Sequence, residues 1–148
     1  MREVKGNIWD FYDRGGWITI PTNGSTRNDG KAVMGRGLAL QANQRFKGFA
    51  GGLGHFLKDH GNVSHVNYIY RAITFPVKHH WMDIADINLI EVSALTLPGI
   101  LDRVELKEIY MVRVGCGNGK LDWKDVKPIL EKYLDDRFII VDKKGEEK

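Results

Sequence analysis

A glycine-rich segment in the last third of this sequence directly follows an apolar run and leads into a helical stretch. Residues 109–114, Ile-Tyr-Met-Val-Arg-Val, are typical of a strand, and residues 115–119 read Gly-Cys-Gly-Asn-Gly. A helix is predicted over residues 123–134, with Asp122 as its N-cap. A strand, a glycine loop and a helix in this order are typical of α/β folds, in which ligands bind beyond the carboxyl ends of strands.

A second unit of the same kind lies nearer the start of the chain. Residues 17–20, Trp-Ile-Thr-Ile, predict a buried strand that is closed by the turn-forming residues 21–24, Pro-Thr-Asn-Gly. A glycine-containing loop follows over residues 30–37. Apolar residues that recur every four positions then predict a helix over residues 34–46.

The remaining segments continue this alternation of strands and helices. Strands are predicted within residues 66–75 and over residues 138–141. Helices are predicted within residues 48–61 and from residue 84 to a stop near Pro98. No internal repeat and no Pro/Ser-rich linker interrupts the pattern, which favours one layered α/β domain.

The chain has the size and composition of a single globular domain. Its 148 residues are 43% hydrophobic, which supplies a core without cross-links. We expect one domain over residues 1–142 and a charged, flexible tail over residues 143–148. The single cysteine, Cys116, cannot form an internal disulfide, and no apolar stretch resembles a signal peptide or a bilayer span, so we expect a cytoplasmic location.

The two glycine loops, at equivalent strand ends, indicate a ligand that carries phosphate groups. Glycine lets backbone N–H groups approach a phosphate closely, and helix N-termini add positive potential. One such loop alone is more often only a turn, but two that face each other can hold a pyrophosphate from both sides. The common nucleotide motifs fit poorly: residues 35–40 lack the third glycine of a dinucleotide fingerprint, and residues 24–32 lack the spacing of a P-loop.

Four segments resemble, in their order and spacing, the macro domain, a fold that binds ADP-ribose. They are residues 5–8 (Lys-Gly-Asn-Ile), 21–24 (Pro-Thr-Asn-Gly), 33–41 (Val-Met-Gly-Arg-Gly-Leu-Ala-Leu-Gln) and 115–123 (Gly-Cys-Gly-Asn-Gly-Lys-Leu-Asp-Trp). Residues 75–81, Phe-Pro-Val-Lys-His-His-Trp, resemble a segment of the DarG antitoxin branch, which reverses ADP-ribosylation of thymine in DNA. The human terminal ADP-ribose protein glycohydrolase is a relative of that branch.

The resemblance implies a three-layer α/β/α macro domain with a mixed, largely parallel central sheet. It assigns catalysis to Lys78 and Asn23. It assigns ADP-ribose contacts to the following residues: Asn7, Ile8, Thr22, Asn23, Met34, Gly35, Arg36, Gly37, Leu38, Gly115, Cys116, Gly117, Asn118, Gly119 and Lys120.

The sequence also departs from the family pattern at three positions. Asn7 stands where many macro domains have aspartate, and Ile20 replaces the first asparagine of the turn that ends at Asn23. Gly119 stands where the human glycohydrolase has its catalytic aspartate. Asp122, three residues further on, is better explained as a helix cap than as a replacement for that aspartate.

Lys78 is the residue with the most specific expected chemistry. Most lysines lie on the surface, but Phe75, Pro76 and Trp81 flank this one and would desolvate it, which lowers a lysine pKa. A desolvated amine can attack the anomeric carbon of a ribose. A charged Lys78 could instead stabilise a departing pyrimidine anion.

The resemblance therefore favours an ADP-ribosyl hydrolase that removes ADP-ribose from a macromolecule, with a DNA base such as thymine as the expected substrate. Two alternatives stay open: a non-catalytic reader of ADP-ribose and a phosphatase acting on ADP-ribose 1″-phosphate. A weaker alternative is a nucleic-acid-binding module, because the net charge of +3 permits a polyanionic partner without requiring one. Expected partners are ADP-ribose, ADP-ribosylated DNA or protein and a cognate ADP-ribosyltransferase toxin. We expect a monomer that does not bind membranes and needs neither a metal nor a cofactor.

Overall fold

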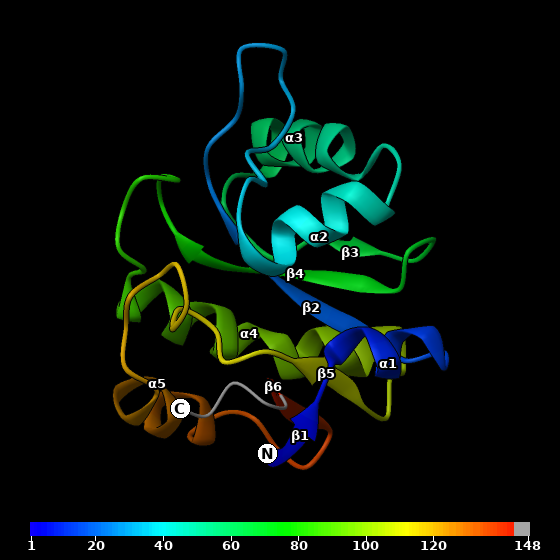
Figure 1. Cartoon of the computed structure of the whole chain (residues 1–148), viewed down its shortest axis with the longest axis vertical. Helices are drawn as coiled ribbons and strands as arrows, with labels where there is room; N and C mark the ends of the chain where they lie inside the picture. The colour runs from blue at the N-terminus through cyan, green and yellow to red at the C-terminus, as the bar shows by residue number, and fades with distance from the viewer. Residues whose placement is uncertain (144–148) are drawn as a thin grey trace.

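Six strands form one sheet in the computed structural model, which describes residues 1–143 (Figure 1). The order of the strands across the sheet is β1-β6-β5-β2-β4-β3. Their bounds are β1 (Arg2–Gly6), β2 (Ile18–Asn23), β3 (Val66–Asn67), β4 (Ala72–Lys78), β5 (Ile109–Met111) and β6 (Phe138–Lys143). All neighbouring strands are parallel except the antiparallel pair β3 and β4, so the predicted mixed, largely parallel sheet is confirmed.

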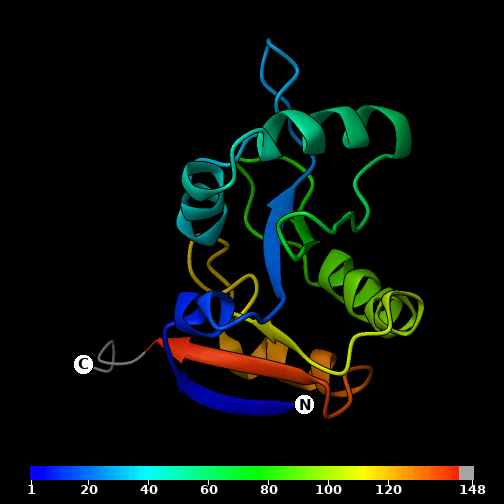
Figure 2. The ribbon, with the colours of Figure 1, turned by 90° about the vertical axis from the view of Figure 1, so that its right-hand side faces the viewer.

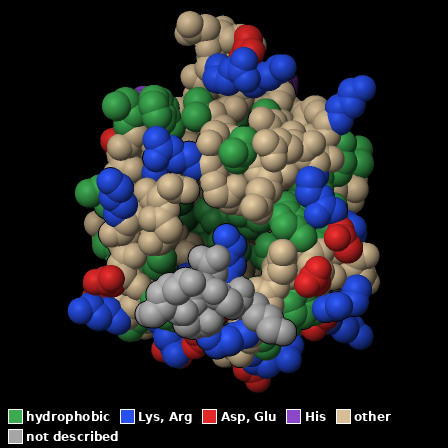
Figure 3. All heavy atoms as spheres, in the orientation of Figure 1, with side chains coloured by type: hydrophobic (Ala, Val, Ile, Leu, Met, Phe, Trp, Pro, Cys, Tyr) green, Lys and Arg blue, Asp and Glu red, His purple; other side chains and the backbone are tan. Residues whose placement is uncertain are grey.

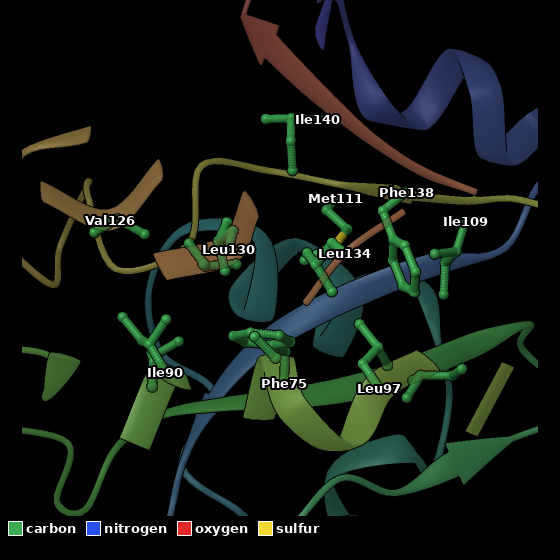
Figure 4. Packing of buried hydrophobic residues seen from close by; sticks show 14 of the residues in the cluster. Phe75, Ile90, Leu97, Ile109, Met111, Val126, Leu130, Leu134, Phe138 and Ile140 are labelled. Atoms are coloured by element: carbon green, nitrogen blue, oxygen red, sulfur yellow. The ribbon is translucent and has the colours of Figure 1, made fainter. Parts of the chain in front are cut away.

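Helices cover both faces of this sheet, which gives the predicted three layers (Figure 2). One face is covered by α1 (Ile8–Asp13), α2 (Gly37–Arg45) and α3 (Phe49–His60), and the other by α4 (Ile87–Val104) and α5 (Trp123–Glu131). Each face has its own buried apolar cluster. Figure 4 shows the one beneath α4 and α5, where Phe75 and Phe138 of the sheet pack with Leu97 and Leu130 of the helices. None of the helices within residues 1–143 is long and apolar enough to cross a bilayer.

Several local predictions differ from the structure. The strand predicted over residues 109–114 ends at Met111, and the helix predicted from residue 34 begins at Gly37. Helix α4 does not stop at Pro98 but continues to Val104, because Ile100 and Leu101 extend its buried face beyond the proline. Strand β1 and helix α1 had no predicted counterpart. Lys143, the first residue of the expected tail, ends β6, and residues 144–148 of that tail lie outside the described residues.

The strands β5, β2 and β4 lie side by side and run parallel, so their carboxyl ends meet at one edge of the sheet. The register between β2 and β4 shifts after Thr22, which pairs with Pro76. Asn23 consequently lies opposite Lys78, and Val77 has no partner of its own in β2. Residues far apart in the sequence thus become neighbours at the edge where ligands of α/β proteins bind.

Candidate active site

A cleft of about 850 Å³ opens at the carboxyl ends of β2, β4 and β5. Figure 3 shows a hollow in the middle of this face, with apolar side chains at its bottom and Lys or Arg side chains along its edge. Most of the residues assigned from the sequence line the cleft. They are Thr22, Asn23, Met34, Gly35, Arg36, Gly37, Leu38, Lys78, Gly115, Gly117, Asn118 and Gly119.

The two glycine loops face each other across the cleft. Gly37 is the first residue of α2 and has a positive φ of 55°, a conformation that glycine adopts without strain. A Cβ atom on Gly37 would lie 3.4 Å from Nδ2 of Asn118 in the opposite loop. The N–H groups at the start of α2 lie beside this narrow passage, an arrangement suited to phosphate groups.

The second loop combines tightly packed and open glycines. A Cβ on Gly115 would lie 2.7 Å from Cδ1 of Ile90, and one on Gly119 would lie 2.4 Å from the carbonyl oxygen of Gly115. Position 119 therefore has no room for a carboxylate side chain. Gly117, in contrast, has no atom within 4 Å of the place a Cβ would occupy, so its backbone is open to a ligand.

Lys78 ends β4 and reaches across to the second glycine loop. Its Nζ donates to the carbonyl oxygens of Trp81 and Asn118, both at 3.4 Å. Burial lowers the pKa of Lys78 below the usual value of 10.5, nearby Arg36 lowers it further, and Asp83 partly opposes the change. The desolvation expected from the sequence is therefore present, and the amine is held inside the cleft.

Asn23, opposite Lys78, uses its side chain to shape the wall of the cleft. Its Oδ1 accepts from the backbone N–H of Ser25 at 2.9 Å, and its Nδ2 donates to the carbonyl oxygen of Val33 at 3.2 Å. The amide still has a hydrogen and a lone pair with which to bind a ribose hydroxyl. Its predicted catalytic role stays a prediction.

Gly24 allows the chain beyond β2 to pack against the chain beyond β4. A Cβ at this position would lie 2.8 Å from the carbonyl oxygen of His79 and 3.0 Å from Nδ2 of Asn62. The same Nδ2 donates to the carbonyl oxygen of Lys78 at 2.9 Å. This hydrogen bond and the close packing at Gly24 therefore fix the backbone at Lys78 and His79.

Four residues assigned from the sequence are not among those that line the cleft. Oδ1 of Asn7 accepts from the N–H of Trp9 at 3.0 Å, so Asn7 caps α1. Ile8, the first residue of α1, is buried in the core. The Cys116 thiol donates to the carbonyl oxygen of Val114, and burial raises its pKa to about 11, so it is a poor nucleophile. Lys120 lies just beyond the second loop, exposed to solvent.

The structure adds cleft residues that sequence reasoning missed. Residues 26–29 belong to a hairpin that projects at the rim (Figure 1), in which Thr26 pairs with Ala32. The turn sequence Asn-Asp-Gly at residues 28–30 was a signal for this hairpin. Trp81 and Arg113 line the cleft from the loops after β4 and β5.

Two further observations concern the titratable side chains around the site. No group of three or more His, Cys, Asp or Glu side chains within the described 143 residues is placed to hold a metal ion. His79, next to Lys78, pairs its Nε2 with Oδ2 of Asp86 at 2.7 Å. Asp86 also caps α4, and these hydrogen bonds keep its pKa below the usual value.

The fold that places this cleft between two glycine loops is shared with solved macro domains. The chain superposes on the macro domain of Mycobacterium tuberculosis DarG with a TM-score of 0.76, at 21% identity over 95% of both chains. The macro domain of Thermus aquaticus DarG gives the same TM-score at 24% identity and the same coverage. The chain is therefore a macro domain by fold, as its motifs predicted.

Sequence relatives confirm the resemblance, and a third solved structure shares the fold. Thermosipho africanus DarTG in complex with ADP-ribose matches all of this chain and 43% of that chain, with a TM-score of 0.76 at 20% identity. The chain is 27% identical over 147 residues to a DNA ADP-ribosyl glycohydrolase of Thermus aquaticus. This alignment covers 91% of the present chain and 38% of the Thermus protein. An enzyme of the same name from Mycobacterium tuberculosis is 30% identical over 107 residues, which are 64% of this chain and 30% of that protein.

A Thermosipho africanus protein that fuses a DNA ADP-ribosyl transferase to a DNA ADP-ribosyl glycohydrolase is 30% identical over 80 residues, which cover 53% of this chain and 21% of that protein. The chain thus spans less than two fifths of the length of these curated relatives. No protein-family model matches the sequence.

Proposed function

We propose that this chain is an ADP-ribosyl hydrolase that breaks the glycosidic bond between ADP-ribose and a DNA base, thymine. The observation that carries the proposal is the position of Lys78, whose partly buried amine lies inside the cleft, 3.4 Å from the carbonyl oxygen of Asn118 in the second glycine loop. The names of its sequence relatives and the ADP-ribose bound to a structural relative support the same substrate class.

The glycine loops would hold the pyrophosphate of ADP-ribose between them. The cleft volume of about 850 Å³ falls in the range of ordinary small-molecule sites. Backbone N–H groups around Gly37 and Gly117 can approach the phosphates, and the Arg36 guanidinium adds positive charge at the same edge. This arrangement would direct the distal ribose toward Asn23 and Lys78.

Lys78 would then act on the anomeric carbon of that ribose. The lowered pKa increases the fraction of neutral amine, which favours nucleophilic attack. Attack forms a bond from Nζ to the anomeric carbon and breaks the bond from that carbon to the base, and the base takes up the proton that Nζ loses. Water then adds its oxygen to the anomeric carbon and gives a proton to Nζ as the bond between Nζ and that carbon breaks, which releases ADP-ribose, restores the lysine and leaves the repaired base in the DNA strand.

A DNA ADP-ribosyltransferase is the partner that this activity requires, because such an enzyme supplies the modified base. The fusion of the two activities in a Thermosipho africanus relative supports this pairing. The chain would act as the antitoxin that reverses the modification.

A parallel assay with three substrates tests the proposal. The protein is incubated with ADP-ribosylated single-stranded DNA, ADP-ribosylated protein and ADP-ribose 1″-phosphate, and the release of ADP-ribose or phosphate is followed. We expect release of ADP-ribose from the DNA. Tight binding of ADP-ribose without any release would identify a reader, and release of phosphate alone would identify a phosphatase; either result would overturn the proposal.

A further inference from the structure

Trp81 is a large aromatic side chain left exposed at the mouth of the cleft. It lines the cleft from the loop that follows β4, and 43% of its surface is accessible to solvent. Tryptophan is on average a highly buried residue, so its exposure beside a reactive amine calls for an explanation. The core does not account for it, because Trp81 belongs to neither apolar cluster among the described residues.

The backbone of Trp81 is fixed on both sides by the residues of the site. Its N–H donates to Oγ of Ser25 at 3.0 Å, and its carbonyl oxygen accepts from Nζ of Lys78 at 3.4 Å. Ser25 is buried, and its own N–H donates to Oδ1 of Asn23. One chain of hydrogen bonds therefore links Asn23, Ser25, Trp81 and Lys78, so the tryptophan is anchored to the residues that would handle the glycosidic bond.

From this geometry we propose that the indole of Trp81 stacks on the DNA base that carries the ADP-ribose. The inference rests on the proposed function and specifies how the nucleic-acid part of the substrate is recognised. An enzyme that acts on a base must take it out of the stack of its neighbours, and an aromatic ring replaces the lost stacking. Among the described residues 1–143, Trp81 is the one aromatic side chain that lines the cleft, and it is exposed.

The connectivity of the substrate distinguishes this base from the adenine of ADP-ribose. In the proposed function Lys78 acts at the distal ribose, and the pyrophosphate between the glycine loops separates that ribose from the adenosine. The group bonded directly to the distal ribose is the modified base. Trp81 contacts Lys78 through its carbonyl oxygen and belongs to neither of the glycine loops proposed to hold the pyrophosphate, which leaves its indole available to the base.

Substitutions at Trp81 test the inference with a matched control. We compare Trp81→Ala, Trp81→Leu and Trp81→Phe with Met82→Ala, which changes a neighbouring apolar residue that is 70% exposed and does not line the cleft. The substrate concentration that gives half of the maximal single-turnover rate is measured on ADP-ribosylated single-stranded DNA. The affinity for free ADP-ribose is measured for each variant by calorimetry.

We expect Trp81→Ala and Trp81→Leu to raise the half-saturating DNA concentration by roughly five- to a hundredfold, the range that stacking on one base supplies. Trp81→Phe should recover most of this loss because phenylalanine keeps a flat ring, and Met82→Ala should match the wild type. Affinity for free ADP-ribose should stay unchanged in all four variants, which also shows that they fold.

Each contrary result has its own meaning. The stacking inference is wrong if Trp81→Leu binds the modified DNA as well as the wild type does. It is also wrong if Trp81→Ala lowers the affinity for free ADP-ribose by the same factor as the affinity for the modified DNA. If the wild-type protein releases no ADP-ribose from DNA, the proposed function itself fails. In that case the stacking inference is tested by fluorescence. The emission of Trp81 is the difference between the spectra of wild type and Trp81→Phe. If the modified DNA does not quench this emission, the stacking inference is wrong.

Discussion

Nζ of Lys78 lies 3.4 Å from the carbonyl oxygen of Asn118, so the last residue of β4 is hydrogen-bonded to the glycine loop that follows β5. The amine and a loop assigned to the phosphates therefore share one contact. If a bound phosphate moves this loop, the carbonyl oxygen that accepts the hydrogen bond of Lys78 moves with it. Ligand binding would then be coupled to the position of the amine.

Removal of the Lys78 amine should abolish most cleavage while sparing the binding of ADP-ribose. Its contribution belongs to the transition state, so Lys78→Ala should lower the single-turnover rate a hundredfold or more, about 3 kcal/mol of barrier. Lys124→Ala, at an exposed position of α5 outside the cleft lining, serves as the control. Cleavage by Lys78→Ala at the wild-type rate would show that the assignment is wrong.

Lys78→Arg separates the two chemical roles of the lysine. Arginine keeps the positive charge but does not readily act as a nucleophile. The lowered pKa favours covalent attack, so we expect no rescue of the rate. Substantial rescue would instead indicate that the charge stabilises the leaving base.

The pH dependence of the rate should follow the same amine. Burial and Arg36 lower the pKa of Lys78, so the neutral form accumulates at lower pH than for a lysine in water. If the neutral form attacks, the rate of wild-type protein rises with pH and levels off before the usual value of 10.5 is reached. A rate that falls as the pH rises toward 10.5 would contradict nucleophilic attack.

Gly117→Val should weaken ADP-ribose binding without damage to the fold. The position has no neighbour within 4 Å of a new Cβ, and its φ is not positive, so the valine fits the free protein and projects toward the ligand. Isothermal titration beside circular dichroism measures both effects. Unchanged affinity in a folded variant would show that this loop does not hold the phosphates.

Two glycines of helix α3 should respond to alanine in opposite directions. A Cβ on Gly54 would lie 1.9 Å from the carbonyl oxygen of Gly30 in the rim hairpin, so Gly54→Ala should lower the free energy of unfolding by about 1–3 kcal/mol. Gly52 is exposed and has no such neighbour, and Gly52→Ala should raise the free energy of unfolding by about 0.5–1 kcal/mol. Urea denaturation of both variants measures the contrast, and a stable Gly54→Ala would mean that the hairpin is free to move away from α3.

Local patterns predicted the central elements well because their signals lie within short windows. The apolar runs of β5 and β6 and the glycines of the second loop are contiguous in the sequence, and the macro domain motifs placed Lys78 and Asn23 in one site. Strand β1 escaped prediction because Arg2, Glu3 and Lys5 make it polar, as suits a strand at the edge of the sheet.

What the sequence did not predict depends on contacts between distant segments. The sequence placed Trp81 beside Lys78, but not its hydrogen bond to Ser25, which is 56 residues away in the chain. Helix α4 passes Pro98 because tertiary packing of its buried face outweighs the missing N–H group of the proline. Asn7 matched a ligand-binding motif, yet its side chain caps a helix, and no local pattern separates these two uses.

The pairing of β1 with β6 has a consequence for synthesis on the ribosome. These strands are the first and last of the sheet in sequence, and Arg2 pairs with Ile139. Residues 2–6 therefore leave the ribosome long before residues 138–143 exist to pair with them. The sheet can close only after almost the whole described chain has been translated, so a nascent or truncated chain that already contains Lys78 still lacks the β1–β6 pairing.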